Sequence, residues 1–212
     1  MNWLIQTLWS SVGRKLLMAV TGLCFCIFLM GHLLGNLTIY AGNEAFNAYA
    51  QRLHALGPLL TLAELGLLLF AIIHVATGLS LFYQNFKARP TRYKIQKRGG
   101  GRTIGSATMP YTGILLLGFI VLHLLNFHFV DKSQTTIAHI VTSAFSNPLY
   151  VIGYVAAMIV AALHVRHGFW SAFQTLGANH PKYMPAIMGL SIVLGLIVGF
   201  GFGLLPLYIA LA

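Results

Sequence analysis

The residues best suited to chemistry in this sequence are its histidines. The chain of 212 residues holds nine His but only three Asp plus Glu. Four of the histidines, His32, His74, His123 and His164, stand inside long apolar runs. An ionisable side chain surrounded by lipid is costly unless it has a partner, so each of the four is a candidate functional residue. Because one such histidine stands on each of four successive runs, we expect the four to serve a common function.

The depth of these histidines predicts two pairs. At about 1.5 Å per helical residue, His32 and His123 fall in the middle or outer half of the membrane, and His74 and His164 lie nearer the cytoplasmic ends of their runs. Two facing imidazoles complete the coordination of a b-type haem iron. A zinc or di-iron site would want thiolates or carboxylates, which these runs almost lack. The pattern therefore predicts two bis-histidine haems that carry electrons.

A haem-free interpretation is open for any single one of these histidines, as a core residue bonded to a neighbouring helix, but it is harder to sustain for four together. On the fourth run, His167 is the alternative ligand, since it shares a helix face with His164. We prefer His164 because it lies deeper. The remaining histidines fall near interfaces or in loops, where an unliganded His is normal: His54, His128, His139 and His180.

The elements that must position these side chains are membrane-spanning helices. The chain is 58% hydrophobic and only 8% charged, which excludes an ordinary soluble domain. Five apolar runs reach about the 20 residues needed to cross a bilayer. They lie at 16–40, 59–86, 110–130, 148–172 and 185–211. We expect an all-α membrane protein, a bundle of five transmembrane helices that forms a single domain over residues 1–212.

The basic residues predict the orientation of this bundle. Eleven of the 13 Lys and Arg fall on one side of the predicted membrane, leaving only Arg52 and Lys132 on the other. Because cytoplasmic flanks carry the excess of Lys and Arg, we expect a cytoplasmic N-terminus and an outer C-terminus in a bacterial inner membrane. The net charge of +10 thus reports topology, and no nucleic-acid partner is expected.

Two of the connecting segments have features of their own. The basic segment 87–102 contains three consecutive glycines and predicts an exposed connector. Its charge serves either topology alone or the docking of a cytoplasmic subunit. On the other side, segment 41–58 carries aromatic residues and Glu44, which suit a stretch lying along the membrane surface.

Small residues beside the histidines would give a porphyrin room. Gly78 follows His74 by four residues, and Gly168 follows His164 by four. Three further glycines lie near the other two histidines: Gly31, Gly35 and Gly118. Small residues also let transmembrane helices pack closely with no cofactor. The last run has glycines at spacing four and no histidine, so we expect it to be structural: Gly195, Gly199 and Gly203.

Six short stretches, taken in order, carry a family resemblance. They are GRKLLMAVTGL at 13–23, FLMGHLLGNL at 28–37, EAFNAYAQRL at 44–53, AIIHVATGL at 71–79, FIVLHLL at 119–125 and ALHVRHGFWSAF at 162–173. Together they resemble the di-haem cytochrome b membrane subunit of succinate:quinone oxidoreductases, the succinate dehydrogenase and fumarate reductase complexes, in the class with five helices in one subunit. The specificity lies in the order and spacing of the stretches, which span most of the chain.

The resemblance implies ligands and partners. In that family one His from each of the first four helices ligates haem, and the matching positions are His32 with His123 and His74 with His164. Electrons would pass between an iron–sulfur subunit, the inner haem, the outer haem and menaquinone. A flavoprotein with covalent FAD would interconvert succinate and fumarate. FAD and iron–sulfur clusters would belong to those partners only. The direction of the reaction and dimerisation of the complex stay open.

Quinone chemistry exchanges protons and therefore wants a titratable acid near its site. Glu64, ten residues before His74, is the first candidate, and Glu44 is the second. Some members of the family carry a proton-conducting glutamate two residues before the fourth-helix ligand, where this chain has Ala162, which puts that proton route in doubt. Arg14 and Lys15 lie at a suitable depth to contact the propionates of the inner haem.

Two other classes of membrane protein compete with this interpretation. A di-haem cytochrome b of a hydrogenase or formate dehydrogenase would also hold two haems, but it uses different helices for its histidines and usually has four spans. A haem-free transporter would be colourless. Haem content and the partners that copurify with the chain separate the three.

Overall fold

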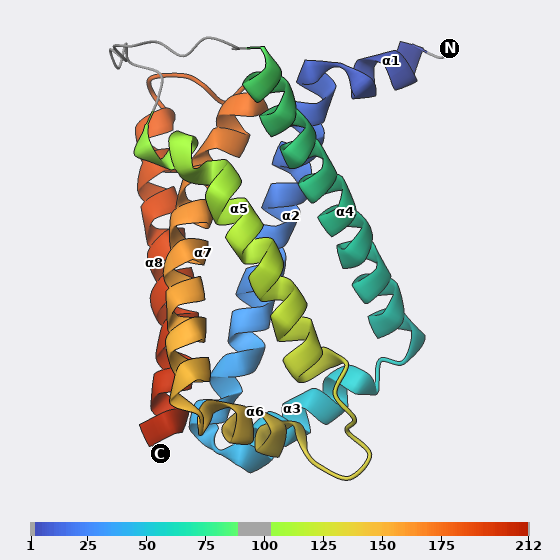
Figure 1. Ribbon diagram of the computed structural model, residues 1–212, viewed down its shortest axis with the longest axis vertical. Helices are drawn as coiled ribbons and strands as arrows, with labels where there is room; N and C mark the ends of the chain where they lie inside the picture. Colours follow the sequence, from blue (N-terminus) through green and yellow to red (C-terminus); the bar gives the residue numbers. More distant parts are fainter. Residues whose placement is uncertain (1–2, 89–102, 212) are drawn as a thin grey trace.

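The computed structural model describes residues 3–88 and 103–211, which fold into helices joined by short connections (Figure 1). Five of these segments are long and apolar enough to cross a membrane, as the sequence predicts. They are formed by α2 (Ser11–Leu37) with the 3-10 turn η1 (Thr38–Ala41), α4 (Pro58–Lys87), α5 (Ile104–His123) with the π-helical turn η2 (Leu124–His128), α7 (Pro148–Thr175) and α8 (Met184–Leu211). Three shorter helices are α1 (Trp3–Trp9), α3 (Asn43–His54) and α6 (Ile137–Phe145).

Polar caps set where the long helices begin. The Ser10 hydroxyl accepts from the Gly13 N–H at 3.0 Å and starts α2 five residues before the predicted span. Thr103 and Ser106 form a reciprocal capping box that starts α5, six residues before the predicted boundary at Pro110. Pro110 instead lies in the second turn of α5, where its missing N–H removes one intrahelical bond without ending the helix.

Four of the long helices pack in a closed ring. In this ring α2 contacts α4, α4 contacts α5, α5 contacts α7, and α7 contacts α2. Helix α8 lies outside the ring and packs along α7 and against α2. A methyl group placed on Gly199 would lie 3.0 Å from Ala162 Cβ, so α7 and α8 approach closely there, as the spacing of the glycines predicts. The fifth span therefore supports the ring from outside.

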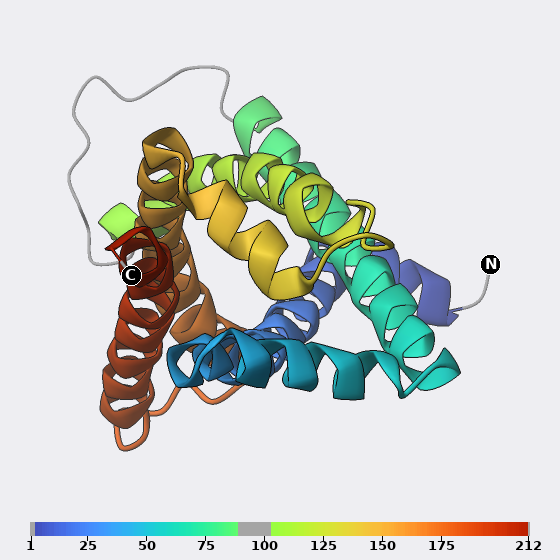
Figure 2. The same cartoon turned by 90° about the horizontal axis from the view of Figure 1, so that it is seen from below.

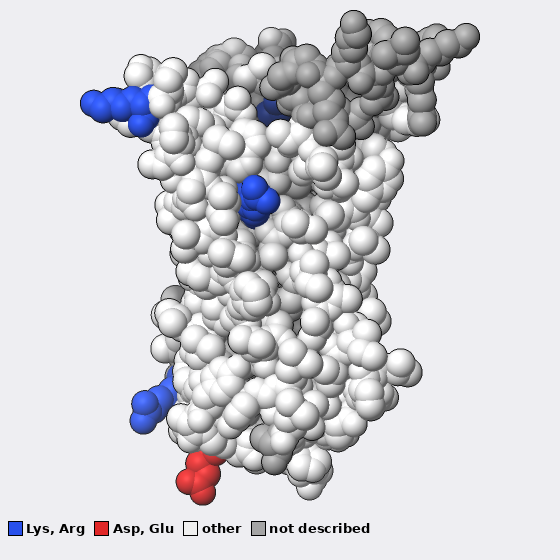
Figure 3. All heavy atoms as spheres, turned by 90° about the vertical axis from the view of Figure 1, so that its left-hand side faces the viewer, with Lys and Arg blue, Asp and Glu red and all other residues white. Residues whose placement is uncertain are grey.

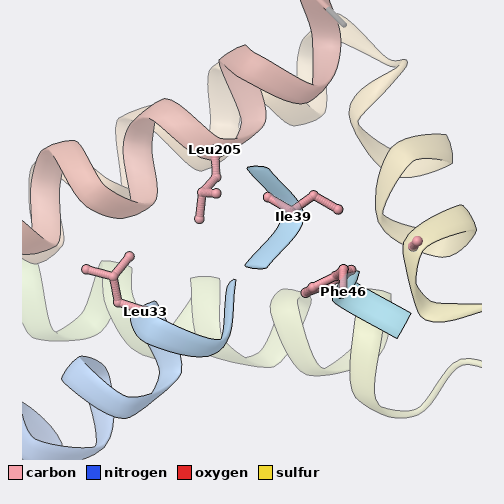
Figure 4. Packing of buried hydrophobic residues seen from close by; sticks show 5 residues of the cluster. Leu33, Ile39, Phe46 and Leu205 are labelled. Atoms are coloured by element: carbon pink, nitrogen blue, oxygen red, sulfur yellow. The ribbon is translucent and has the colours of Figure 1, made fainter. Parts of the chain in front are cut away.

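One end of the bundle is covered by α3 and α6, which lie across the ends of the long helices (Figure 2). The predicted surface segment 41–58 thus contains a helix, and α6 is a second one that the sequence did not suggest. Asn47 Oδ1 accepts from the Ala138 N–H at 3.0 Å and joins the two. Buried apolar side chains fill the space beneath them (Figure 4): Leu33, Ile39, Phe46, Ala138 and Leu205. We call this the α3–α6 end and the opposite one the α1 end.

The surface fits a lipid environment. Large apolar side chains are exposed along the spans, including Ile27 (75%), Leu62 (67%) and Ile152 (65%). In Figure 3 the charged groups of one face lie mostly toward its two ends, and the surface between them is nearly uncharged. Helix α1 and the end of α8 lie at opposite ends of the bundle (Figure 1). Which end is cytoplasmic stays a prediction, and the basic segment 89–102 lies outside the described residues.

Candidate functional site

The ring of four helices carries the four predicted histidines, one on each helix, and all four are partly buried. His32 on α2 faces His123 at the end of α5. His74 lies on α4 and His164 on α7. In the described part of the chain, neither α2 with α5 nor α4 with α7 is among the closely packed helix pairs. The His32–His123 pair therefore reaches across the ring between helices that do not pack tightly together.

The spacing of the first pair suits a metal between the rings. The His32 and His123 ring centres are 5.9 Å apart, with the ring planes at 88°. A metal–imidazole nitrogen bond is about 2 Å, so two such bonds in line would place the ring centres about 6 Å apart. His123 is the last α-helical residue before the π turn η2, and turns of this kind are frequent at functional sites.

His123 also carries a polar atom without a partner. Its Nδ1 is buried and makes no hydrogen bond within the described residues. The ring is enclosed by aromatic side chains whose centres lie 5–6 Å away: Phe119 at 5.8 Å, Phe127 at 5.3 Å and Tyr154 at 6.1 Å. A buried polar group left unsatisfied costs about 1–3 kcal/mol, and the aromatic surroundings supply no hydrogen-bond partner for this nitrogen.

The second pair is held differently. His74 Nδ1 lies 3.1 Å from Thr21 Oγ1 of α2, and His164 Nδ1 lies 3.0 Å from Thr112 Oγ1 of α5. A glycine follows each threonine: a methyl group on Gly22 would lie 3.3 Å from His74 Cε1, and one on Gly113 would lie 3.5 Å from His164 Cε1. Each imidazole is therefore seated against a Thr-Gly pair of the neighbouring helix.

Sequence reasoning missed Thr21 and Thr112, although a signal was available. Thr21-Gly22 stands eleven residues before His32, and Thr112-Gly113 stands eleven residues before His123. The following histidines repeat as well, in the pattern His-Val-x-x-Gly at 74–78 and 164–168. The two halves α2–α4 and α5–α7 thus use the same residues at the same spacing to seat one imidazole each.

The alternative ligand His167 takes another position. It packs against the first turn of α5, where a methyl group on Gly105 would lie 2.8 Å from His167 Nδ1. Its ring also meets Trp170 edge-on, with the centres 5.0 Å apart. The threonine-seated position on α7 belongs to His164.

Arg14 and Lys15, the predicted propionate contacts, separate in the structure. Arg14 is partly buried against α4, and its Nη1 donates to Ser80 Oγ at 2.6 Å. Gln84, one turn further on, accepts from Arg14 Nη2 at 2.9 Å when its amide oxygen faces the guanidinium. Lys15 is exposed. Seven residues separate Arg14 from Thr21, which puts it about 10 Å from the His74 ring toward the α1 end.

All three side-chain carboxylates of the protein lie toward the α3–α6 end. Glu64 Oε1, near the start of α4, is 3.9 Å from His128 Nδ1, and both side chains are more than 40% exposed. Glu44 is exposed in the first turn of α3. Asp131 accepts hydrogen bonds from the backbone N–H and hydroxyl of Ser133, which hold the pKa of this exposed carboxyl below its usual range. Arg14 therefore has no carboxylate of this chain to pair with.

A cavity of about 270 Å³ opens at the α3–α6 end. Its lining is polar but without a carboxylate: Asn126, Ser143, Ala144, Asn147 and Tyr150. Asn126 Nδ2 donates to the hydroxyl of Tyr154 at 3.2 Å, and the Tyr154 ring contacts His123. The cavity offers hydrogen bonds to a small polar group, and Asn126 connects its lining to the Tyr154 ring beside His123.

No protein-family model, curated protein or solved structure matches this chain. The fold and the site therefore define it as a protein with five helices able to cross a membrane, with one pair of facing histidines, His32 and His123, and with two further histidines, His74 and His164, each held against a threonine of a neighbouring helix.

Proposed function

We propose that this chain is the membrane anchor and electron-transfer subunit of a succinate dehydrogenase or fumarate reductase complex. In this proposal it connects an iron–sulfur subunit to menaquinone through two bis-histidine b haems. The observation that carries the proposal is the pair of imidazoles, His32 and His123, whose centres lie 5.9 Å apart on opposite helices of a membrane-embedded ring. Iron with two histidine ligands is closed to substrate and suits electron transfer.

Each residue of the site has a role in this proposal. His32 with His123 and His74 with His164 would hold the two haems, which supply reversible one-electron transfer. Thr21, which contacts His74, lies eleven residues before His32 on the same helix. The two histidine pairs are therefore about 16 Å apart along the bundle. The enclosing aromatic rings would exclude water from the His123 side.

Arg14 supports a propionate-bearing cofactor. Ser80 and Gln84 hold its guanidinium, but both are neutral and leave its charge uncompensated. Because the chain has no carboxylate toward the α1 end, an anion that pairs with Arg14 would have to come from another molecule. A haem propionate directed from the His74–His164 pair toward that end would supply it. Lys15, exposed on the same turn, is less suited to this role.

The partners in this proposal follow from the family resemblance. The α1 end would face the cytoplasm of a bacterium and meet the iron–sulfur subunit, which connects to the FAD-bearing flavoprotein. The chain would then contribute the anchor, the haems and the quinone site, and no succinate chemistry of its own. The excess of Lys and Arg predicted on that side supports docking of an acidic subunit.

Haem quantification on the purified chain tests the proposal directly. We expect a reducible b-type spectrum, about two haems per chain and two steps in a redox titration. A colourless protein would reject both cytochrome interpretations and favour a transporter. Copurification with a hydrogenase or formate dehydrogenase, in place of a flavoprotein that reduces fumarate, would reject the assignment to succinate:quinone oxidoreductases.

Glu64 provides a separate test of the quinone site. We expect Glu64→Gln to lower quinol turnover about 100-fold, since a positioned acid or base contributes roughly 10²–10⁴-fold, with both haems retained. Turnover with a soluble menaquinol analogue and the haem spectrum are the two measurements. Asp131→Asn is the matched control, because it removes an exposed carboxylate at the same end of the bundle. Unchanged turnover in Glu64→Gln would transfer the role to Glu44.

A further inference from the structure

We propose that Thr21 and Thr112 are positioning residues that fix the tautomers of His74 and His164. Each threonine oxygen accepts a hydrogen bond from the Nδ1–H of its histidine, which leaves the lone pair on Nε2 free to bind a metal. This inference rests on the proposed function for the identity of that metal. The tautomers themselves are a property of the chain.

The direction of these hydrogen bonds follows from counting hydrogens. A hydroxyl has one hydrogen to donate, and both threonines direct theirs to carbonyl groups of their own helix, one turn earlier. The acceptors are Leu17 O at 2.7 Å and Met18 O at 3.2 Å for Thr21, and Thr108 O at 3.2 Å and Met109 O at 3.1 Å for Thr112. With its hydrogen used in this way, each hydroxyl accepts from the histidine, and we assign the hydrogen of that bond to Nδ1. In a neutral imidazole the other nitrogen, Nε2, then has the lone pair.

Burial keeps this arrangement from exchanging with water. Thr21 is 3% exposed and Thr112 is 9% exposed, so little solvent reaches either hydroxyl. The glycine beside each threonine lets the imidazole lie directly against the backbone of the neighbouring helix. A larger residue at Gly22 would meet His74 Cε1 at 3.3 Å and displace the ring. The hydrogen bond and the close approach together fix the ring and its protonated nitrogen.

The hydrogen bond between threonine and histidine occurs in only one of the two histidine pairs. Metal-bound histidines almost always donate their second ring nitrogen to a hydrogen-bond acceptor, which orients the ring and strengthens its electron donation to the metal. Both members of the His74–His164 pair have such an acceptor. In the other pair, His123 Nδ1 has no partner among the described residues. The threonines would thus lower the redox potential of a metal held by His74 and His164, and not that of a metal held by His32 and His123.

Redox titration of valine variants tests the proposal, because valine keeps the shape of threonine and removes its oxygen. In Thr21→Val and Thr112→Val we expect the oxidised-to-reduced ratio of the His74–His164 haem to change about tenfold, which is a rise of about 59 mV for one electron. The other haem should not shift. Serine at either position keeps a hydroxyl and should restore the potential. Thr77→Val is the matched control, since Thr77 is 8% exposed and bonds back to Ile73 O and His74 O without contacting an imidazole nitrogen.

A second measurement reads the tautomers whether or not haem is bound. Nitrogen-15 NMR of the full chain labelled at histidine, in the reduced diamagnetic form if haem is present, should show His74 and His164 with hydrogen on Nδ1. Thr21→Val should change only the nitrogen signals of His74, and Thr112→Val only those of His164. Hydrogen on Nε2 in the parent chain, or an equal response to Thr77→Val, would overturn the inference. Absence of haem with Nδ1–H histidines would reject the proposed function and leave the inference standing.

Discussion

Replacement of His123 by alanine is expected to lower the haem content from about two per chain to about one. His123 is the partner of His32 across the ring, and the phenylalanines beside it, Phe119 and Phe127, could not replace its imidazole as a ligand. The His74–His164 pair lies about 16 Å further along the bundle and should keep its haem. Haem extraction assays and the redox titration together measure the change.

His128→Ala is the control for this experiment. His128 ends the π turn that follows His123, five residues further on, but it is exposed and faces Glu64. Its removal should leave both haems in place. His32→Ala should reproduce the loss seen with His123→Ala, because either imidazole is needed to close the same site. Loss of both haems, or of neither, would contradict the pairing of His32 with His123.

The second large effect is expected on α7, where two histidines compete for the role of ligand. His164→Ala should remove the haem of the His74–His164 pair, again lowering the content from about two to about one. His167→Ala should leave the content unchanged, because His167 packs on Gly105 and Trp170 while His164 occupies the position facing Thr112. The two substituted positions lie three residues apart on one helix, so each variant serves as a control for the other.

Two further measurements, the rate of haem reduction and the helical content, distinguish the loss of one haem in His164→Ala from a general loss of structure. With His164 replaced, reduction of the remaining haem by the iron–sulfur partner should fall at least about tenfold, the lower range for loss of an interaction at a metal site. The helical circular dichroism of the variant should match that of the parent chain. If His167→Ala removes the haem and His164→Ala does not, the ligand assignment on α7 is reversed.

Membrane crossing and the number of spans could be read from sequence because both depend on composition over about 20 residues. The apolar runs at 59–86, 148–172 and 185–211 agree with α4, α7 and α8 within three residues at each end. Boundaries set by single side chains were less accurate. Pro110 suggested the start of a span, but the capping box of Thr103 and Ser106 begins α5 six residues earlier, since proline in an early turn does not end a helix. Helix α6 lacks the length of a span and was missed for that reason.

For the candidate site, sequence was enough to single out the four histidines and to group them by depth, because the position of a residue along a spanning helix fixes its height in the membrane. The order of the helices around the ring could not be read this way, because it depends on which faces pack together. Only the tertiary structure sets His32 opposite His123. It also directs Arg14, unlike Lys15, to Ser80. Finally, it brings Thr21 to the imidazole of His74 and Thr112 to that of His164. The threonines are separated from their histidines by 53 and 52 residues, and a hydrogen bond over that distance in sequence exists only once the helices have packed.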